Sequence, residues 1–149
     1  MIPHGRSGAD FRACRELCGY TQTSAAQNLA ITNGKYYDRA LIRKWEKEWQ
    51  GEWHPSGPAW AWMDAELEHH EEEVERILNE AIELHEQGKE VILVLFAFED
   101  GTDELQNDNR PAAVSNAIVR DAWMYMLAEG IEPTFVYATE AGRYPDAIW

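Results

Sequence analysis

The sequence lacks any apolar run long enough to cross a membrane, which takes about 20 predominantly apolar residues in a helix. Its opening residues also lack the apolar core of a secretory signal peptide. We therefore expect a cytoplasmic protein with no membrane association. A chain of 149 residues has room for one or two small domains that each enclose a hydrophobic core.

Cysteine is scarce, and no metal-binding spacing is present. Cys14 and Cys18 are four residues apart on the apolar face of a helical pattern, where free cysteine behaves as a small hydrophobe. A structural zinc site needs two further ligands, which the neighbouring sequence does not supply. His69 and His70 do not have the His-Glu-x-x-His spacing, and no third ligand is near them. We expect buried thiols, no metal and no other cofactor.

Basic residues are also few, with 13 Lys and Arg against 27 Asp and Glu and a net charge of −14. Such an excess of acid would repel nucleic acid if it were spread evenly. It is not, because residues 1–60 hold slightly more basic than acidic side chains and the remaining residues carry almost all of the excess acid. This asymmetry indicates an N-terminal part that can approach phosphate and an acidic C-terminal part.

The N-terminal part reads as three short helices. Ser7 and Asp10 have the spacing of a capping box, and Gly19 is a plausible stop for this first helix. Thr21 is a good N-cap for a second helix, which a turn at Thr32-Asn33-Gly34 ends. The expected buried positions of the two helices are Phe11, Cys14, Leu17, Cys18, Ala25, Ala26 and Leu29.

The third helix follows Asp38, which is placed to cap it. Ile42, Trp45 and Trp49 are spaced so that they share one apolar face. The opposite side is cationic and carries Arg39, Arg43, Lys44 and Lys47. A short helix of this kind suits a DNA groove, although an ordinary surface helix with a solvated charged face has the same pattern. The order of helix, tight stop, short helix, turn and basic helix is typical of a helix-turn-helix unit.

Three stretches, Tyr20-Thr21-Gln22, Ala25-Ala26 with Leu29, and Ile42-Arg43-Lys44-Trp45-Glu46, resemble the core of XRE/Cro-type helix-turn-helix domains. The Trp-Glu pair most resembles the YdiL-like regulators, a group that includes the anti-CRISPR-associated autorepressors. In this family the Thr-Gln pair opens the second helix and the Val-Arg-Arg-Trp-Glu-like run belongs to the recognition helix. The order of elements after residue 57 agrees with the family, so the resemblance covers nearly the whole chain.

The chain departs from this family between its second and third helices. More residues than usual separate Ile31 from Trp45, and Gly34-Lys35-Tyr36-Tyr37 is expected to form an inserted loop. This departure affects the angle and reach of the recognition helix.

The predicted DNA contacts follow from helix ends and cationic side chains. The unpaired amides at a helix N-terminus, here Thr21 and Gln22, can anchor a phosphate. Arginine and lysine can bind phosphates or the acceptor edge of guanine. Tyr36 and Tyr37 either donate to phosphate or pack against the domain, and Trp45 is assigned to the core. The candidate DNA-binding residues are Thr21, Gln22, Lys35, Tyr36, Tyr37, Arg39, Arg43 and Lys44.

A connector at residues 50–57 precedes a long helix that starts near Pro58 and ends at Gly88. Its apolar positions alternate steps of three and four, and Leu78 and Ile82 widen the stripe, which favours packing on a sheet or a bundle. The stripe consists of Trp60, Met63, Leu67, His70, Val74, Ile77, Ala81 and Leu84.

The last third of the chain reads as strand, helix, strand. Val91–Phe96 is a continuous apolar run of strand length, 113–129 has a helical pattern ended by Gly130, and 134–139 is a second strand. This is a βαβ unit with a parallel pair. Because two parallel strands cannot hide their edges, another surface must complete the sheet, and an identical chain is the simplest supplier.

We therefore predict a mainly α protein with a small α/β part. A helix-turn-helix bundle occupies residues 1–57, and a long helix with a βαβ dimerisation domain occupies 58–149. The predicted function is that of a dimeric transcriptional repressor or autorepressor that reads a palindromic operator in double-stranded DNA through the helix around Arg43. An antitoxin-like or phage-encoded module whose acidic half binds a basic protein is the alternative. We expect no enzyme, because the acidic stretch from Glu99 to Asn109 has no companion His, Ser or Lys constellation.

Overall fold

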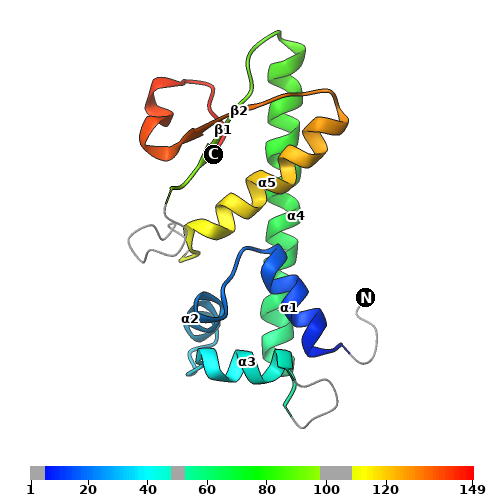
Figure 1. The fold of residues 1–149 in the computed structure, drawn as a ribbon, viewed down its shortest axis with the longest axis vertical. Coiled ribbons are helices and arrows are strands. Elements are labelled where there is room, and N and C mark those ends of the chain that lie inside the picture. Colours follow the sequence, from blue (N-terminus) through cyan, green and yellow to red (C-terminus); the bar gives the residue numbers. More distant parts are fainter. Residues whose placement is uncertain (1–5, 48–52, 98–108) are drawn as a thin grey trace. The chain divides into compact units, whose positions relative to one another are not determined.

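A computed structural model describes residues 6–47, 53–97 and 109–149 of the chain. Its fold is mainly helical with a two-stranded parallel sheet, as expected (Figure 1). The chain divides into two compact units, Met1–Glu68 and His69–Trp149. The elements in order are α1 (Gly8–Leu17), α2 (Gln22–Asn33), α3 (Arg39–Lys47), α4 (Gly57–Glu86), β1 (Ile92–Leu95), α5 (Ala112–Ala128), β2 (Thr134–Tyr137) and the 3-10 helix η2 (Ala138–Arg143).

The three short helices of the first unit begin and end where local side chains satisfy their free backbone groups. Ser7 and Asp10 form the predicted capping box at the start of α1. The Thr21 hydroxyl accepts a hydrogen bond from the Ser24 backbone N–H at the start of α2. Asp38 accepts one from the Leu41 N–H, 2.8 Å away, at the start of α3. All three predicted N-caps are therefore confirmed.

The core of the first unit is aromatic. The Phe11 ring is fully buried and meets the rings of Trp45 and Trp60 edge to face, at centroid distances of 5.8 and 5.2 Å. The predicted core positions that are buried are Phe11, Cys18, Ala25, Ala26, Leu29, Ile42 and Trp45. Leu17 was wrongly assigned to this core, because it is the last residue of α1 and its side chain is 48% exposed.

Cys14 is only partly buried, so the prediction of two buried thiols holds fully for Cys18 alone. Burial raises the pKa of the Cys14 thiol above its ordinary value. Both cysteines are free thiols.

The first part of α4 belongs to the first unit. The Trp62 indole N–H donates to the buried Asn28 side chain at 2.8 Å, and the Tyr20 hydroxyl donates to the buried Glu66 carboxylate at 2.9 Å. These bonds join α4 to Asn28 of α2 and to Tyr20, which lies between α1 and α2. The units consequently divide at Glu68 rather than at residue 57, where the change in composition placed the boundary.

The second unit contains the predicted βαβ arrangement. β1 and β2 pair in parallel, with Ile92 opposite Thr134 and Leu95 opposite Tyr137, and α5 connects them (Figure 1). The predicted second strand ends two residues early, because Ala138–Arg143 turns into η2. In the second unit, the predicted stripe of α4 is buried at His70, Val74, Ile77 and Ala81, whereas Leu84 is half-buried.

β1 also pairs along its other edge with the chain itself. Ile148 forms a parallel bridge to Leu93, in which the Ile148 N–H donates to the Ile92 carbonyl and the Val94 N–H donates to the Ile148 carbonyl. The sequence suggested an identical chain as the simplest supplier of a surface that completes the sheet, but the chain itself supplies the partner at this edge. The need for a further surface remains only at β2, which has β1 as its one neighbouring strand among the described residues.

Within the described residues, no helix combines the length and the hydropathy that crossing a membrane requires. Trp49 and the acidic residues from Glu99 to Asp108 lie outside the described ranges, so the predictions made for them are not addressed by the fold.

Candidate nucleic-acid interface

The two sides of α3 differ sharply in chemistry. Ile42 and Trp45 are buried against α1 and α2, as predicted. The exposed side carries four cationic side chains around the small Ala40, and together they line an open hollow of about 550 Å³. The lining residues are Arg39, Ala40, Arg43, Lys44 and Lys47, so none of the described carboxylates contributes to the hollow.

A buried polar network fixes α3 to its neighbours. The Arg15 guanidinium of α1 donates through Nε and Nη2 to the two carboxylate oxygens of Glu46, at 2.7 and 2.8 Å. Its Nη1 donates to the Tyr20 carbonyl at 2.8 Å. Gln22, the first residue of α2, also donates to Glu46, at 3.3 Å. One carboxylate on α3 thus receives donors from α1 and from α2.

A glycine permits a close approach between α1 and α3. A Cβ atom at Gly8 would lie 1.9 Å from the Trp45 carbonyl oxygen, which no side chain can tolerate without movement of the backbone. The absence of a side chain at this position therefore decides how near α3 can lie to the start of α1.

Among the eight predicted contact residues, the four cationic side chains are exposed and available. Arg39, Arg43 and Lys44 lie on the outer side of α3. Lys35 is exposed before α3, and its ammonium lies 5.9 Å from the Tyr37 ring centroid. The structure thus brings Arg39, Arg43 and Lys44 together and leaves Lys35 outside their hollow.

Thr21 and Gln22 stand at the start of α2, where the predicted phosphate anchor would lie. The Thr21 hydroxyl is used within the capping box, and the Gln22 amide is held by Glu46. Their side chains therefore have structural partners. A contribution to anion binding would come from the backbone N–H groups of the first turn of α2.

The two tyrosines of the inserted loop have different surroundings. Tyr36 is 80% exposed and free to reach a ligand. Tyr37 is 7% exposed, packs edge to face on Trp45, and accepts a hydrogen bond from the Asn33 amide at 3.1 Å. The sequence left open whether these tyrosines contact phosphate or pack against the domain, and Tyr37 packs against the domain. Tyr37 is thus not suited to donate to phosphate.

Sequence reasoning placed Lys47 on the cationic side of α3 but left it out of the contact set, and it missed Ala40 and Trp53. The Lys44 ammonium lies 4.5 Å from the centroid of the half-exposed Trp53 ring, which is a cation–π distance. Trp53 comes from a segment whose composition indicated only a connector, so no sequence signal pointed to this contact. Ala40 could have been found from its helical position between Arg39 and Arg43.

Comparison of the chain with protein-family models, with curated proteins and with solved structures finds no match. Within the described residues, no group of three His, Cys, Asp or Glu side chains could share a metal ion. The surface of α3 presents four cationic side chains and the small side chain of Ala40.

Proposed function

We propose that the protein is a sequence-specific DNA-binding regulator, a repressor that inserts α3 into the major groove. The observation that carries this proposal is the exposed side of α3, where Arg39, Arg43, Lys44 and Lys47 surround Ala40. Side chains at the exposed face of such a helix reach base edges and phosphates, and Arg and Lys bind guanine and phosphate oxygens. A small residue in the middle lets the helix approach the bases closely.

Two acidic residues of the described range beside α3 have partners within the fold. Glu46 is held by Arg15, and its side chain is only 4% exposed. Asp38 is engaged with the Leu41 backbone. Both carboxylates thus have partners within the fold, and among the described residues the hollow on the outer side of α3 is lined by four cationic side chains and Ala40, which favours contact with a phosphate backbone.

Fixed docking of α3 supports sequence-specific rather than merely electrostatic binding. Base readout requires that side chains are held at defined positions, since a good bidentate contact discriminates by about 1–3 kcal/mol. The Arg15–Glu46 pair and the close contact at Gly8 hold α3 against α1 from two independent places. Tyr36 in the neighbouring loop is available for an additional phosphate contact.

The test is a mobility-shift titration of the full chain on the DNA upstream of its own gene. We expect binding that weakens with rising salt, and a severe loss of affinity in the double variant Arg43→Ala, Lys44→Ala. The salt slope of the double variant should be shallower by about 0.9 for each phosphate contact that is lost. A charge-matched control, Lys89→Ala with Arg143→Ala in the second unit, should bind as the parent does. Equal affinity of the α3 variant and this control would refute the proposal.

We further propose that the repressor acts as a dimer. Support comes from α5 and β2, which expose Met124, Leu127 and Tyr137. α5 contains only two ionisable side chains of Asp, Glu, Lys or Arg, namely Arg120 and Asp121. A helix that is apolar nearly all round is usually covered on every side. Two-fold regulators read two half-sites about one DNA turn apart, so a palindrome is the expected operator.

A protein-interaction module is the second candidate, and the same exposed apolar side chains favour it. If a foreign basic protein covers Met124 and Leu127, the chain alone is monomeric and its α3 variant has no DNA-binding phenotype. The mobility-shift titration and the oligomeric state of the full chain, measured together, therefore distinguish the two functions.

A further inference from the structure

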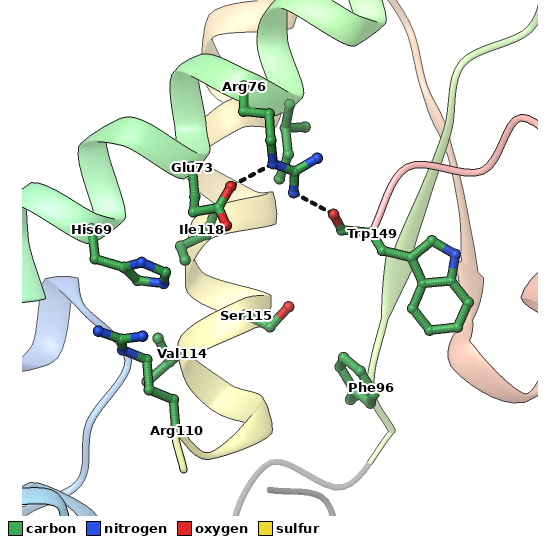
Figure 2. A pocket seen from close by; sticks show the side chains of 10 residues that line it. His69, Glu73, Arg76, Phe96, Arg110, Val114, Ser115, Ile118 and Trp149 are labelled. Carbon is green, nitrogen blue, oxygen red and sulfur yellow. Dashed lines mark hydrogen bonds and ion pairs between the residues drawn. The ribbon is translucent and has the colours of Figure 1, made fainter. Parts of the chain in front are cut away.

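The two edges of the parallel sheet in the second unit differ. On the β1 side the end of the chain closes the edge, because Ile148 pairs with β1 and the Trp149 carbonyl accepts a hydrogen bond from Arg76 of α4. Figure 2 shows the contact between Arg76 and Trp149 beside a pocket of about 190 Å³, which lies between α4, α5 and the end of the chain. On the β2 side, β1 is the one neighbouring strand among the described residues. The edge of β2 is therefore the open one.

The direction of the main-chain groups along β2 follows from its pairing with β1. The Thr134 N–H donates to the Val91 carbonyl at 2.9 Å, so Thr134 and Val136, two residues further on, turn their N–H and C=O groups toward β1. The peptide bonds of the described residues are trans, and the C=O and N–H of a trans peptide point in opposite directions. The residues that alternate with these two consequently turn their groups away from β1.

Three residues at this edge have outward main-chain groups. Phe135 turns both its N–H and its C=O outward, and Tyr137 turns its N–H outward. Pro133 adds an outward C=O but no donor, because proline has no N–H. The Tyr137 carbonyl is in use, since Tyr137 is the N-cap of η2 and the carbonyl of an N-cap residue accepts the first bond of its helix. Within the described ranges, the edge thus has two donors and two acceptors without partners.

This set of groups is complementary to itself. Two copies of β2 could run antiparallel with one Phe135 opposite the other. Each Phe135 N–H would then donate to the Phe135 carbonyl of the other copy, and each Tyr137 N–H would donate to the Pro133 carbonyl of the other copy. In this register the proline, which has no donor, stands opposite the Tyr137 carbonyl, which needs none. Four hydrogen bonds form, and each outward donor and acceptor of the three residues has a partner.

A strand of another protein fits this edge less well. An extended peptide would place an N–H opposite the Tyr137 carbonyl unless it had a proline at that position, and a buried N–H without a partner is costly. A second copy has the proline in the required place. Because a two-fold interface uses the same groups twice, the pattern favours a second copy of this chain.

The side chains at this edge also suit a second copy. β2 contains no charged residue, so two acidic chains meet there without like charges on the paired strands. The Phe135 ring packs edge to face on Trp123 of α5, at a centroid distance of 5.4 Å. A two-fold axis through the Phe135 pair is perpendicular to the sheet, so both α5 helices lie on one face of the joined sheet. The exposed Met124 and Leu127 of both copies then belong to the same side of the dimer.

We propose that the second unit dimerises through the edge of β2, with two copies paired antiparallel about a two-fold axis at Phe135. The result is one sheet in the order β1, β2, β2, β1, in which neither β2 has an open edge. This inference rests on the dimer of the proposed function and specifies its interface. It does not rest on DNA binding.

The test compares Tyr137→Pro with Tyr137→Ala in the full chain by sedimentation equilibrium without DNA. Tyr137 has a φ of −79° and a ψ of 153°, which proline adopts without strain, and its N–H is not used in pairing with β1. Proline therefore removes two of the four hydrogen bonds between the copies, whereas alanine removes the same side chain and keeps the N–H. We expect a dissociation constant at least about tenfold higher for Tyr137→Pro than for Tyr137→Ala.

A cysteine cross-link tests the register without the proline variant. The Thr134 residues of the two copies would be diagonal neighbours on one face of the sheet, about 7–8 Å apart. Thr134 is exposed, so we expect Thr134→Cys to be cross-linked between copies by a short bismaleimide, with the linked residue identified by peptide mass mapping. The control is Thr139→Cys, which is equally exposed but lies further from the axis and should not be linked to its counterpart. Circular dichroism verifies the folding of each variant.

Equal dissociation constants for the two Tyr137 variants, or no cross-link at position 134, would overturn the proposal. A monomeric parent chain would also overturn it and would leave the β2 edge to a strand of another protein. If that monomer still binds DNA through α3, only the dimer has failed. If instead the parent is a dimer with this cross-link but the α3 variant keeps its DNA affinity, the DNA-binding function has failed and the interface stands.

Discussion

The Arg15 side chain of α1 and the Glu46 side chain of α3 form a pair of parallel hydrogen bonds between groups that are 8% and 4% exposed. Arg15 and Glu46 also have further partners, the Tyr20 carbonyl and the Gln22 amide. The pair therefore joins the start of α2 to both neighbouring helices. Its charges are well compensated, and loss of one partner would leave the other buried and unpaired.

Replacement of Arg15 by Ala is expected to lower the free energy of unfolding by about 3–5 kcal/mol, because Glu46 then stays buried without its counter-charge. Urea denaturation followed by circular dichroism measures this loss. The double variant Arg15→Met, Glu46→Leu should recover most of it. Arg12→Ala is the control: Arg12 pairs with Glu16 on the surface, at 64% and 54% exposure, and should change stability by less than about 1 kcal/mol. Equal effects at Arg15 and Arg12 would contradict the structural role of the buried pair.

Gly8→Ala is expected to destabilise the first unit by about 1–3 kcal/mol, since the new methyl group would collide with the Trp45 carbonyl and push α3 away. Thermal unfolding measures the change. Gly57→Ala is a matched control at the start of α4, where a Cβ has nothing within 4 Å. The prediction fails if the two variants have the same midpoint. Gly8→Ala should also weaken DNA binding, because α3 is displaced without any change of its cationic residues.

Asp10 links the stability of α1 to pH. Hydrogen bonds from the Ser7 backbone N–H and hydroxyl lower the pKa of the Asp10 carboxyl. A lowered pKa in the folded state means that the ionised form adds stability above the unfolded pKa of about 3.9, and that this stability is lost as the pH falls through the folded value. Asp10→Asn should therefore be less stable than the parent at pH 7.

The difference between the parent and Asp10→Asn should shrink as the pH falls below about 3.9, because the unfolded parent is protonated there first and the folded carboxyl follows at its lower pKa. Urea midpoints at pH 7 and pH 3 provide the comparison. The control is Asp146→Asn. Asp146 is an exposed carboxylate whose one ion-pair partner among the described residues is Lys89, at 3.9 Å, so the variant should alter the midpoint little at either pH. A gap for Asp10→Asn that is equally large at both pH values would argue against ionisation as its cause.

Charge introduced on the outer side of α5 should prevent dimer formation. Met124→Lys with Leu127→Lys places two charges on side chains that are 60% and 45% exposed, so the fold of the monomer should tolerate them. We expect a dimer for the parent and a monomer for the double variant in sedimentation equilibrium at micromolar concentration. Ile31→Lys, at an apolar residue of α2 that is 59% exposed, should leave the dimer intact. A monomeric parent protein would refute the dimer.

The helices of the first unit were predictable because their signals are local. Ser7, Thr21 and Asp38 each cap a helix a few residues away, and the apolar spacing of Ile42 and Trp45 gives the buried side of α3 directly. The cationic side of α3 follows from the same periodicity. These features need no knowledge of distant contacts.

Long-range contacts were not predictable from such patterns. The buried state of Glu66 cannot be read from its neighbours in the sequence, because its hydrogen-bond partner Tyr20 is far away along the chain. The burial of Tyr37 likewise depends on Trp45 and Asn33. The pocket beside α5 combines residues from four separate stretches, and no sequence pattern relates Ser115 to Trp149.

The bridge between Leu93 and Ile148 also affects the order of events during synthesis of the chain. β1 leaves the ribosome before residue 148 is made, and the backbone N–H and C=O groups along this edge lack Ile148 as their partner in the meantime. Completion of this sheet edge must therefore wait for residue 148, whereas the first unit is translated earlier. A nascent chain halted before residue 148 would expose a strand edge that is prone to aggregation.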